Sequence, residues 1–97
     1  MAGSLNENIK QLRLSCNYSQ VEFAKILGVT KQCVSNWEND NVVPSIEMLN
    51  KIADVFNVTT DYLLGRSNKK FIDVSGLTEA QMGHILLLVN DFLELNK

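Results

Sequence analysis

The sequence predicts an all-α fold, in which several short helices form one domain and a longer apolar helix follows it. Apolar residues recur at helical spacing along most of the chain. Helix-start signals, such as Ser19 with Glu22 and Thr78 with Gln81, precede several of these runs. The length of 97 residues leaves room for one domain and a short extension, and the 45% apolar content allows a core.

The first two helices follow from spacing and end signals. Leu5, Ile9 and Leu12 lie on one side of a predicted helix over residues 5–15. A second helix is expected to start near Gln20, with Gly28 just beyond its end, where a positive φ costs glycine little. The apolar side of this second helix is predicted to consist of Val21, Phe23, Ala24 and Leu27.

The third predicted helix begins at Lys31, after a cap at Thr30, and has two unlike sides. Val34 and Trp37 turn inward, with Cys33 beside them. The other side carries small or amide-bearing polar residues: Lys31, Gln32, Ser35 and Asn36. Two short helices joined by a turn of about three residues match helix-turn-helix geometry, and a side of this composition suits the reading of base edges in DNA. An ordinary helical hairpin in a small bundle is the alternative.

Two more helices complete the domain. Residues 39–41 (Asn-Asp-Asn) predict a turn, because Asn and Asp tolerate a left-handed backbone. Pro44 and Ser45 open a fourth helix, and Thr59 or Thr60 caps a fifth that ends at Gly65. The fourth helix is expected to bury Ile46, Leu49, Ile52, Ala53 and Phe56. The residues expected to close the core are Val58, Tyr62, Leu63 and Leu64.

These segments together resemble the helix-turn-helix family of phage repressors and Cro proteins, often called the XRE family. The matching runs are IKQLR (9–13), SQVEFAKILGV (19–29), VSNWEN (34–39) and VPSIEMLNKIADVFNVTTDYLLG (43–65). They cover roughly two-thirds of the chain, in order and at specific spacings. The resemblance implies a five-helix, lambda-repressor-like DNA-binding domain over residues 5–66 that usually acts as a dimer.

The resemblance also implies which residues read DNA. Lys31, Gln32 and Asn36 match base-reading positions of the family, and Ser35 is a supporting contact. Gln and Asn can pair with adenine, and Lys can donate to guanine. The alternative for each residue is a solvated helix surface.

The resemblance further implies contacts to the DNA backbone and one structural ion pair. The candidate backbone contacts are Gln20, Thr30, Asn39 and Asn41. Of these, Gln20 matches a family glutamine that touches both a phosphate and the reading helix. Arg13 and Glu38 match a pair that joins the first helix to the end of the third, and an exposed pair of this kind contributes less than about 1 kcal/mol.

The charge is unusual for a nucleic-acid binder. The chain carries 9 Lys and Arg against 11 Asp and Glu, a net charge of −2 with a pI of about 5.2. Residues 5–66 hold six basic and seven acidic side chains. Asp40, where most family members have glycine, adds a negative charge near the expected path of a phosphate. We therefore expect binding through helix N-termini, backbone amides and polar side chains, with weak salt dependence.

Residues 77–97 are predicted to form a separate helical unit after a linker over residues 67–76. Thr78 caps a helix that runs to about Leu95. Its seam resembles that of a coiled coil and consists of Met82, Ile85, Leu86, Val89, Phe92 and Leu93. A helix this apolar is not left exposed, so it packs on its own domain, on a second copy or on another protein. Dimerisation is the preferred interpretation.

The remaining features argue against several classes of protein. There is one histidine, no nucleophile-elbow serine and no phosphate-binding glycine loop, so we expect no enzyme, no cofactor and no metal. No apolar run reaches the roughly 18 residues of a membrane span, and residues 1–4 are a tag-like or disordered start, so we expect a cytoplasmic protein without membrane contact. Cys16 and Cys33 are expected to be buried or half-buried, with a redox switch at Cys33 as the alternative.

Two functions remain. The first is a sequence-specific regulator of transcription that binds double-stranded DNA, expected to be a repressor acting as a homodimer on a two-fold operator. The alternative is an antitoxin or partner-regulated interaction module with the same fold, whose C-terminal helix binds a toxin or another protein antagonist. Both can hold together, because an antitoxin can also repress its own promoter.

Overall fold

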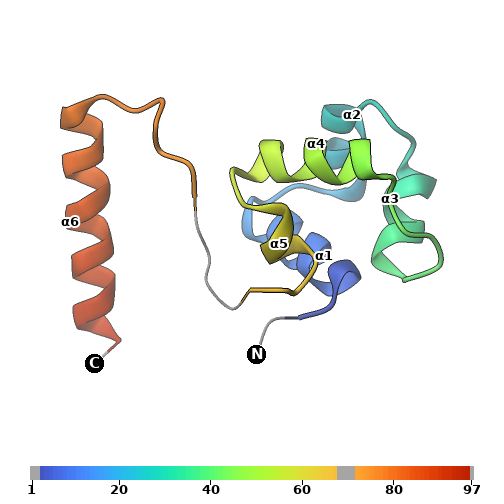
Figure 1. Cartoon of the computed structure of the whole chain (residues 1–97), viewed down its shortest axis with the longest axis horizontal. Helices are drawn as coiled ribbons and strands as arrows, with labels where there is room; N and C mark the ends of the chain where they lie inside the picture. The colour runs from blue at the N-terminus through green and yellow to red at the C-terminus, as the bar shows by residue number, and fades with distance from the viewer. Residues whose placement is uncertain (1–2, 68–71, 97) are drawn as a thin grey trace.

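The computed structural model describes residues 3–67 and 72–96, which contain six α-helices and no strand. Five helices form one group, and the sixth, α6 (Glu79–Leu95), stands apart from them (Figure 1). The helices of the group are α1 (Leu5–Ser15), α2 (Gln20–Leu27), α3 (Lys31–Glu38), α4 (Ile46–Phe56) and α5 (Thr60–Leu63). The predicted all-α architecture is confirmed.

Side-chain caps set where most of these helices begin. The Ser19 hydroxyl accepts a hydrogen bond from the backbone of Glu22, whose carboxylate accepts one from the Ser19 backbone. Thr78 and Gln81 form the same reciprocal pair at α6. Single hydroxyl caps start three more helices, at Thr30, Ser45 and Thr59, whereas α1 has no side-chain cap hydrogen bond. Each cap contributes on the order of 1 kcal/mol to helix stability. Because capping depends on the residue type at one position, these helix starts were predictable from the sequence.

The core lies entirely within the five-helix group. Its fully buried side chains are Ile9, Phe23, Leu27, Val34, Ile52 and Leu63. The rings of Phe23 and Phe56 pack with their centroids 5.2 Å apart, which joins α2 to α4. Trp37 of α3 is 7% exposed and belongs to the same cluster, as predicted. All these residues lie between positions 9 and 63, so α6 contributes nothing to this core.

Four residues expected in the interior are exposed instead. Val21 is 45% exposed, Ile46 is 79% exposed and Leu64 is 39% exposed, while Cys16 is also exposed and Cys33 is half-buried. Val21 and Ile46 lie in the first two residues of α2 and α4, and Cys16 and Leu64 are the residues that end α1 and α5. The ends of such short helices extend past the core, so helical spacing alone places too many residues inside.

The chain returns to the five-helix group before it enters α6. Asn57 ends α4 with a left-handed backbone (φ 53°), and its carbonyl accepts a hydrogen bond of 3.2 Å from the N–H of Asp73. The Asp73 carboxylate in turn accepts from the N–H of Ser75, which lowers the pKa of that carboxyl. We call residues 72–75 the strap. Part of the predicted linker, residues 68–71, lies outside the described residues.

Candidate nucleic-acid interface

The outer side of α3 is polar and accessible. Lys31 and Gln32 are exposed, whereas Ser35 and Asn36 are half-buried. Val34, Trp37 and Glu38 occupy the buried side of the same helix. The two groups therefore lie on different sides of α3, as the sequence predicts.

Two hydrogen-bonded pairs organise this polar side. The Nε2 amide of Gln32 donates to Oδ1 of Asn36 over 3.0 Å. One turn further on, Nδ2 of Asn39 donates to the Ser35 hydroxyl over 3.2 Å. Both pairs join residues four apart, which are neighbours on a helix surface. The polar groups are thus held in a defined order along α3.

The turn that follows α3 keeps the candidate backbone contacts close to its end. Asp40 adopts a left-handed backbone (φ 60°), as the turn prediction requires. The N–H groups of Asn41 and Val42 then donate back to the carbonyl of Asn36, over 2.9 and 3.3 Å. Asn39 and Asn41 are exposed on this turn. Thr30 lies at the other end of α3, where its hydroxyl accepts from the N–H of Cys33.

A buried ion pair holds α3 against α1. Nε and Nη2 of Arg13 donate to the two carboxylate oxygens of Glu38 over 2.7 and 3.0 Å, and Nη1 donates to the carbonyl of Tyr18 over 2.7 Å. The two side chains are only 9% and 2% exposed. The sequence prediction that this pair contributes only the small free energy of an exposed ion pair is wrong, because both groups are removed from water.

Gln20 extends this network to the start of α2. It is half-buried, and its Nε2 donates to Oε1 of Glu38 over 3.2 Å. The expected contact of this glutamine with the reading helix is thus present, at the last residue of α3. A phosphate contact remains a proposal. Three helices, α1, α2 and α3, meet at the Glu38 carboxylate.

Two residues that hold helices together were not predicted from the sequence. Nδ2 of buried Asn8 donates to the carbonyls of Tyr62 and Leu63, which ties α1 to α5. Nζ of Lys51 donates to the carbonyl of Leu27 over 2.7 Å, which satisfies the end of α2 from α4. A polar residue beside Ile9 on an otherwise apolar side was a usable signal for Asn8. Nothing in the sequence marks Lys51.

These contacts reduce the positive charge available for DNA. Arg13 is neutralised by Glu38, and the ammonium of Lys51 is directed to a backbone carbonyl. Lys31 is the only basic residue within α3 itself. The polar side of α3 must therefore rely on neutral donors and acceptors rather than on a broad positive field.

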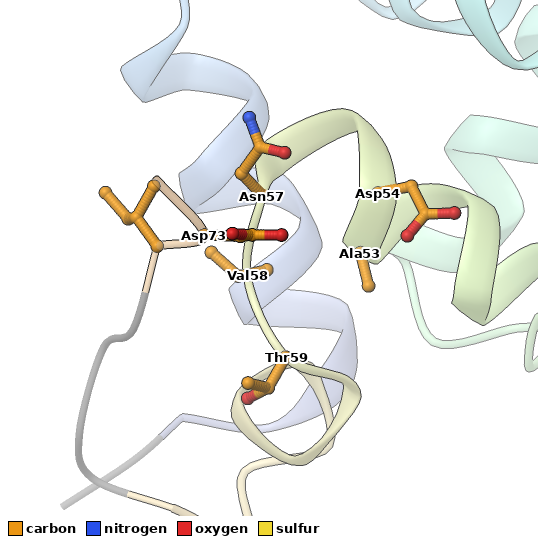
Figure 2. Close-up of a pocket in the computed structure, with 7 residues that line it drawn as sticks. Ala53, Asp54, Asn57, Val58, Thr59 and Asp73 are labelled. Carbon is orange, nitrogen blue, oxygen red and sulfur yellow. The ribbon is translucent and has the colours of Figure 1, made fainter. Parts of the chain in front are cut away.

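The structure also has a small hollow between the strap and the α4–α5 connection (Figure 2). Its lining includes the carboxylates Asp54 and Asp73 together with Asn57, Thr59 and Ile72. Its volume of about 260 Å³ is below the roughly 300–1,000 Å³ of sites for small molecules, and we assign it no ligand. In the described parts of the chain, no cluster of three or more His, Cys, Asp or Glu is placed to hold a metal ion. None of the helices in residues 3–67 and 72–96 has the length and apolar character needed to cross a membrane.

The fold and this polar helix define a helix-turn-helix protein with a lambda-repressor-like domain. A sequence model of the helix-turn-helix family matches residues 9–63, and the chain belongs to this family, within the XRE (Cro/C1) type of DNA-binding transcription regulators. Several of the proteins to which it is similar are transcription regulators.

Two curated relatives show the range of this similarity. The transcriptional regulator ImmR of Bacillus subtilis (strain 168) is 34% identical over 91% of this chain and 76% of its own length. The antitoxin PezA of Streptococcus pneumoniae serotype 4 is 34% identical over 63% of this chain but only 39% of its own length. The similarity to PezA is therefore confined to part of that protein.

Two solved structures share the fold. The P22 c2 repressor in complex with a synthetic operator has 26% identity and a TM-score of 0.63, covering 68% of this chain and all of that one. A structure of the SinR protein/SinI protein complex has 27% identity and a TM-score of 0.60, covering 95% of this chain and 96% of that one. The first match confirms the lambda-repressor-like domain, and the second extends over nearly the whole chain.

Proposed function

We propose that this chain is a repressor that binds a two-fold operator as a homodimer. The observation that carries the proposal is the polar outer side of α3, which is accessible while the opposite side is locked into the core. Its base-reading residues are Lys31, Gln32, Ser35 and Asn36. Its contacts to the DNA backbone are Gln20, Thr30, Asn39 and Asn41. The P22 c2 repressor, which shares this domain, has been solved on operator DNA, and that supports the proposal.

The proposed dimer contact is α6. No side chain of α6 is buried, although most of its residues from Ile85 to Leu95 are apolar. On a helical projection its large apolar residues other than Leu87 cover an arc of about 180°, wider than the seam of a two-stranded coil. The seam proposed for dimerisation is Met82, Ile85, Leu86, Val89, Phe92 and Leu93. Burying it in a second copy removes a surface that a monomer would leave in water.

Selection of bound sequences from random duplex DNA tests this function. A dimer of this kind should select a palindrome whose half-site centres lie roughly 10–10.5 base pairs, or about 34 Å, apart. Sedimentation of the full chain should show a concentration-dependent homodimer. A chain ending at Arg66 keeps the whole core and should sediment mainly as a folded monomer. Selection of single, unpaired half-sites by a monomeric full chain would contradict the proposal.

A second candidate function is that of a partner-regulated module, including an antitoxin. Two observations favour it: the similarity to PezA, and the nearly full-length match to SinR solved with SinI. In this case α6 binds another protein. The two functions separate experimentally, because a partner-binding α6 leaves the purified chain monomeric or aggregated until the partner is added. A stable homodimer with a palindromic site favours the first function.

A further inference from the structure

The polar groups on α3 are not equivalent, because one of them orients another. Nε2 of Gln32 has two hydrogens, and one is donated to Oδ1 of Asn36 over 3.0 Å. This bond fixes the plane of the Gln32 amide on the surface of the helix. The second hydrogen of Nε2 and the carbonyl oxygen Oε1 make no hydrogen bond to the described residues.

What Gln32 still offers is a donor and an acceptor on one planar group. Adenine presents the complementary pair in the major groove, an N7 acceptor and an N6 donor. Guanine presents two acceptors there, so it would leave Oε1 of Gln32 facing another oxygen. Asn36 still offers two donors instead of a donor and an acceptor. Its Oδ1 already accepts from Gln32, whereas both hydrogens of its Nδ2 remain available.

We propose that Gln32 reads one adenine in each half-site and that Asn36 is its positioning residue, through the hydrogen bond that joins them. This inference rests on the proposed function and assigns separate roles to two members of its reading surface. Asn36 itself directs donors toward an acceptor on a neighbouring base. The Gln32–Asn36 bond lowers the ordering cost of reading, because the Gln32 amide is oriented before DNA arrives.

The experiment compares base preference rather than total affinity. The wild-type protein first yields a selected operator. Competition binding then measures the four bases at each half-site position for wild type, Gln32→Ala, Asn36→Leu and Asn36→Asp. Leucine branches at Cγ as asparagine does but has no acceptor, whereas aspartate keeps the acceptor and lacks the donors. Ser15→Ala is the matched control, because it removes an exposed side-chain hydrogen bond, from the Ser15 hydroxyl to the Gln11 carbonyl, on α1 and outside the reading surface.

The expected results differ for each variant. Wild type should prefer adenine at one position by roughly 10- to 100-fold, the range for one bidentate contact. Gln32→Ala and Asn36→Leu should reduce this preference to less than about threefold. Asn36→Asp should keep it within about threefold of wild type, even though its added charge weakens overall binding, and Ser15→Ala should leave it unchanged. Placing 7-deazaadenine at that position, which removes N7, should weaken wild type about tenfold and Gln32→Ala hardly at all.

Several outcomes would overturn the inference. One is an adenine preference that survives Asn36→Leu, and another is a preference lost equally in Asn36→Asp and Asn36→Leu. Thermal unfolding of each variant, together with the NMR signals of the Gln32 side-chain amide in free protein, separates lost folding from lost orientation. A wild-type protein that selects no sequence overturns the proposed function itself. A selected operator with no adenine that depends on Gln32 overturns only this inference.

Discussion

Removal of Arg13 should be far more damaging than removal of an ordinary surface charge. In Arg13→Met, the Glu38 carboxylate stays buried and keeps only the 3.2 Å hydrogen bond from Gln20. The Tyr18 carbonyl also loses its 2.7 Å donor. Breaking a buried pair from one side costs about 3–5 kcal/mol. A folded domain of about 60 residues has a total stability of only roughly 3–9 kcal/mol, so much of it would be lost.

Thermal unfolding followed by far-UV circular dichroism measures this effect. Each kcal/mol lowers Tm by about 4–8 °C in a domain of this size, so Arg13→Met should lower Tm by at least about 12 °C. The double variant Arg13→Met/Glu38→Leu should recover most of the loss, because no buried charge is left unpaired. Lys10→Met, on the exposed side of the same helix, is the control and should change stability by less than about 0.5 kcal/mol.

A small effect would refute this reasoning. A loss of less than about 1 kcal/mol in Arg13→Met would mean that the pair behaves as an exposed one, contrary to its burial. Failure of the double variant to recover stability would mean that packing of the arginine stem, rather than the unpaired carboxylate, dominates the loss.

Four further predictions follow from other parts of the molecule. Gln32→Ala and Asn36→Ala should each weaken operator binding roughly 10- to 100-fold in a gel-shift assay while Tm stays within about 3 °C of wild type, and operator affinity equal to that of wild type would contradict the site. Val89→Asp should shift sedimentation toward the monomer, whereas Leu87→Asp, which lies on the polar side of α6, should not; equal behaviour of the two would argue against the assigned seam. The slope of log affinity against log salt should be shallow, less steep than about −5 per half-site, because each neutralised phosphate contributes about −0.9 and two of the six basic residues in 5–66, Arg13 and Lys51, are already engaged within the domain. The hydrogen bond from the backbone N–H of Ser19 lowers the pKa of Glu22. The stability that this contact contributes is therefore present above the ordinary carboxyl pKa and is lost as pH falls through the lowered pKa. Glu22→Ala should remove this part of the acid sensitivity, which unfolding measured as a function of pH would show.

Much of the fold was predictable because its signals are local. A hydroxyl followed three residues later by Glu or Gln marks a helix start within four residues of chain, and the starts at Ser19 and Thr78 confirm it. The left-handed turns at Gly28 and Asp40 follow from residue type in the same way. The two sides of α3 were also predictable, because eight residues of a helix need only helical spacing to divide them.

The features that were missed depend on packing between distant segments. Arg13 and Glu38 are 25 residues apart, and only the close approach of α1 and α3 removes them from water. Asn8 reaches carbonyls more than 50 residues away, and Lys51 reaches one 24 residues away. Spacing along a helix says which side a residue takes, but not whether a neighbouring helix extends far enough to cover it. Ile46 is exposed for this reason: its spacing places it on the apolar side of α4, but no neighbouring helix in the described part of the chain covers it.

The hydrogen bond between Asp73 and Asn57 limits how far the start of α6 can lie from the five-helix group. Four residues separate Asp73 from the cap of α6 at Thr78, and an extended chain advances at most about 3.6 Å per residue. The start of α6 therefore stays within about 18 Å of the α4–α5 corner while this bond holds. In the dimer proposed through α6, residues added after Asp73 would lengthen the reach between the two α3 helices, whereas residues added before it would not. A dimer that must span a longer or shorter operator would therefore change its length at the few positions between Asp73 and Thr78.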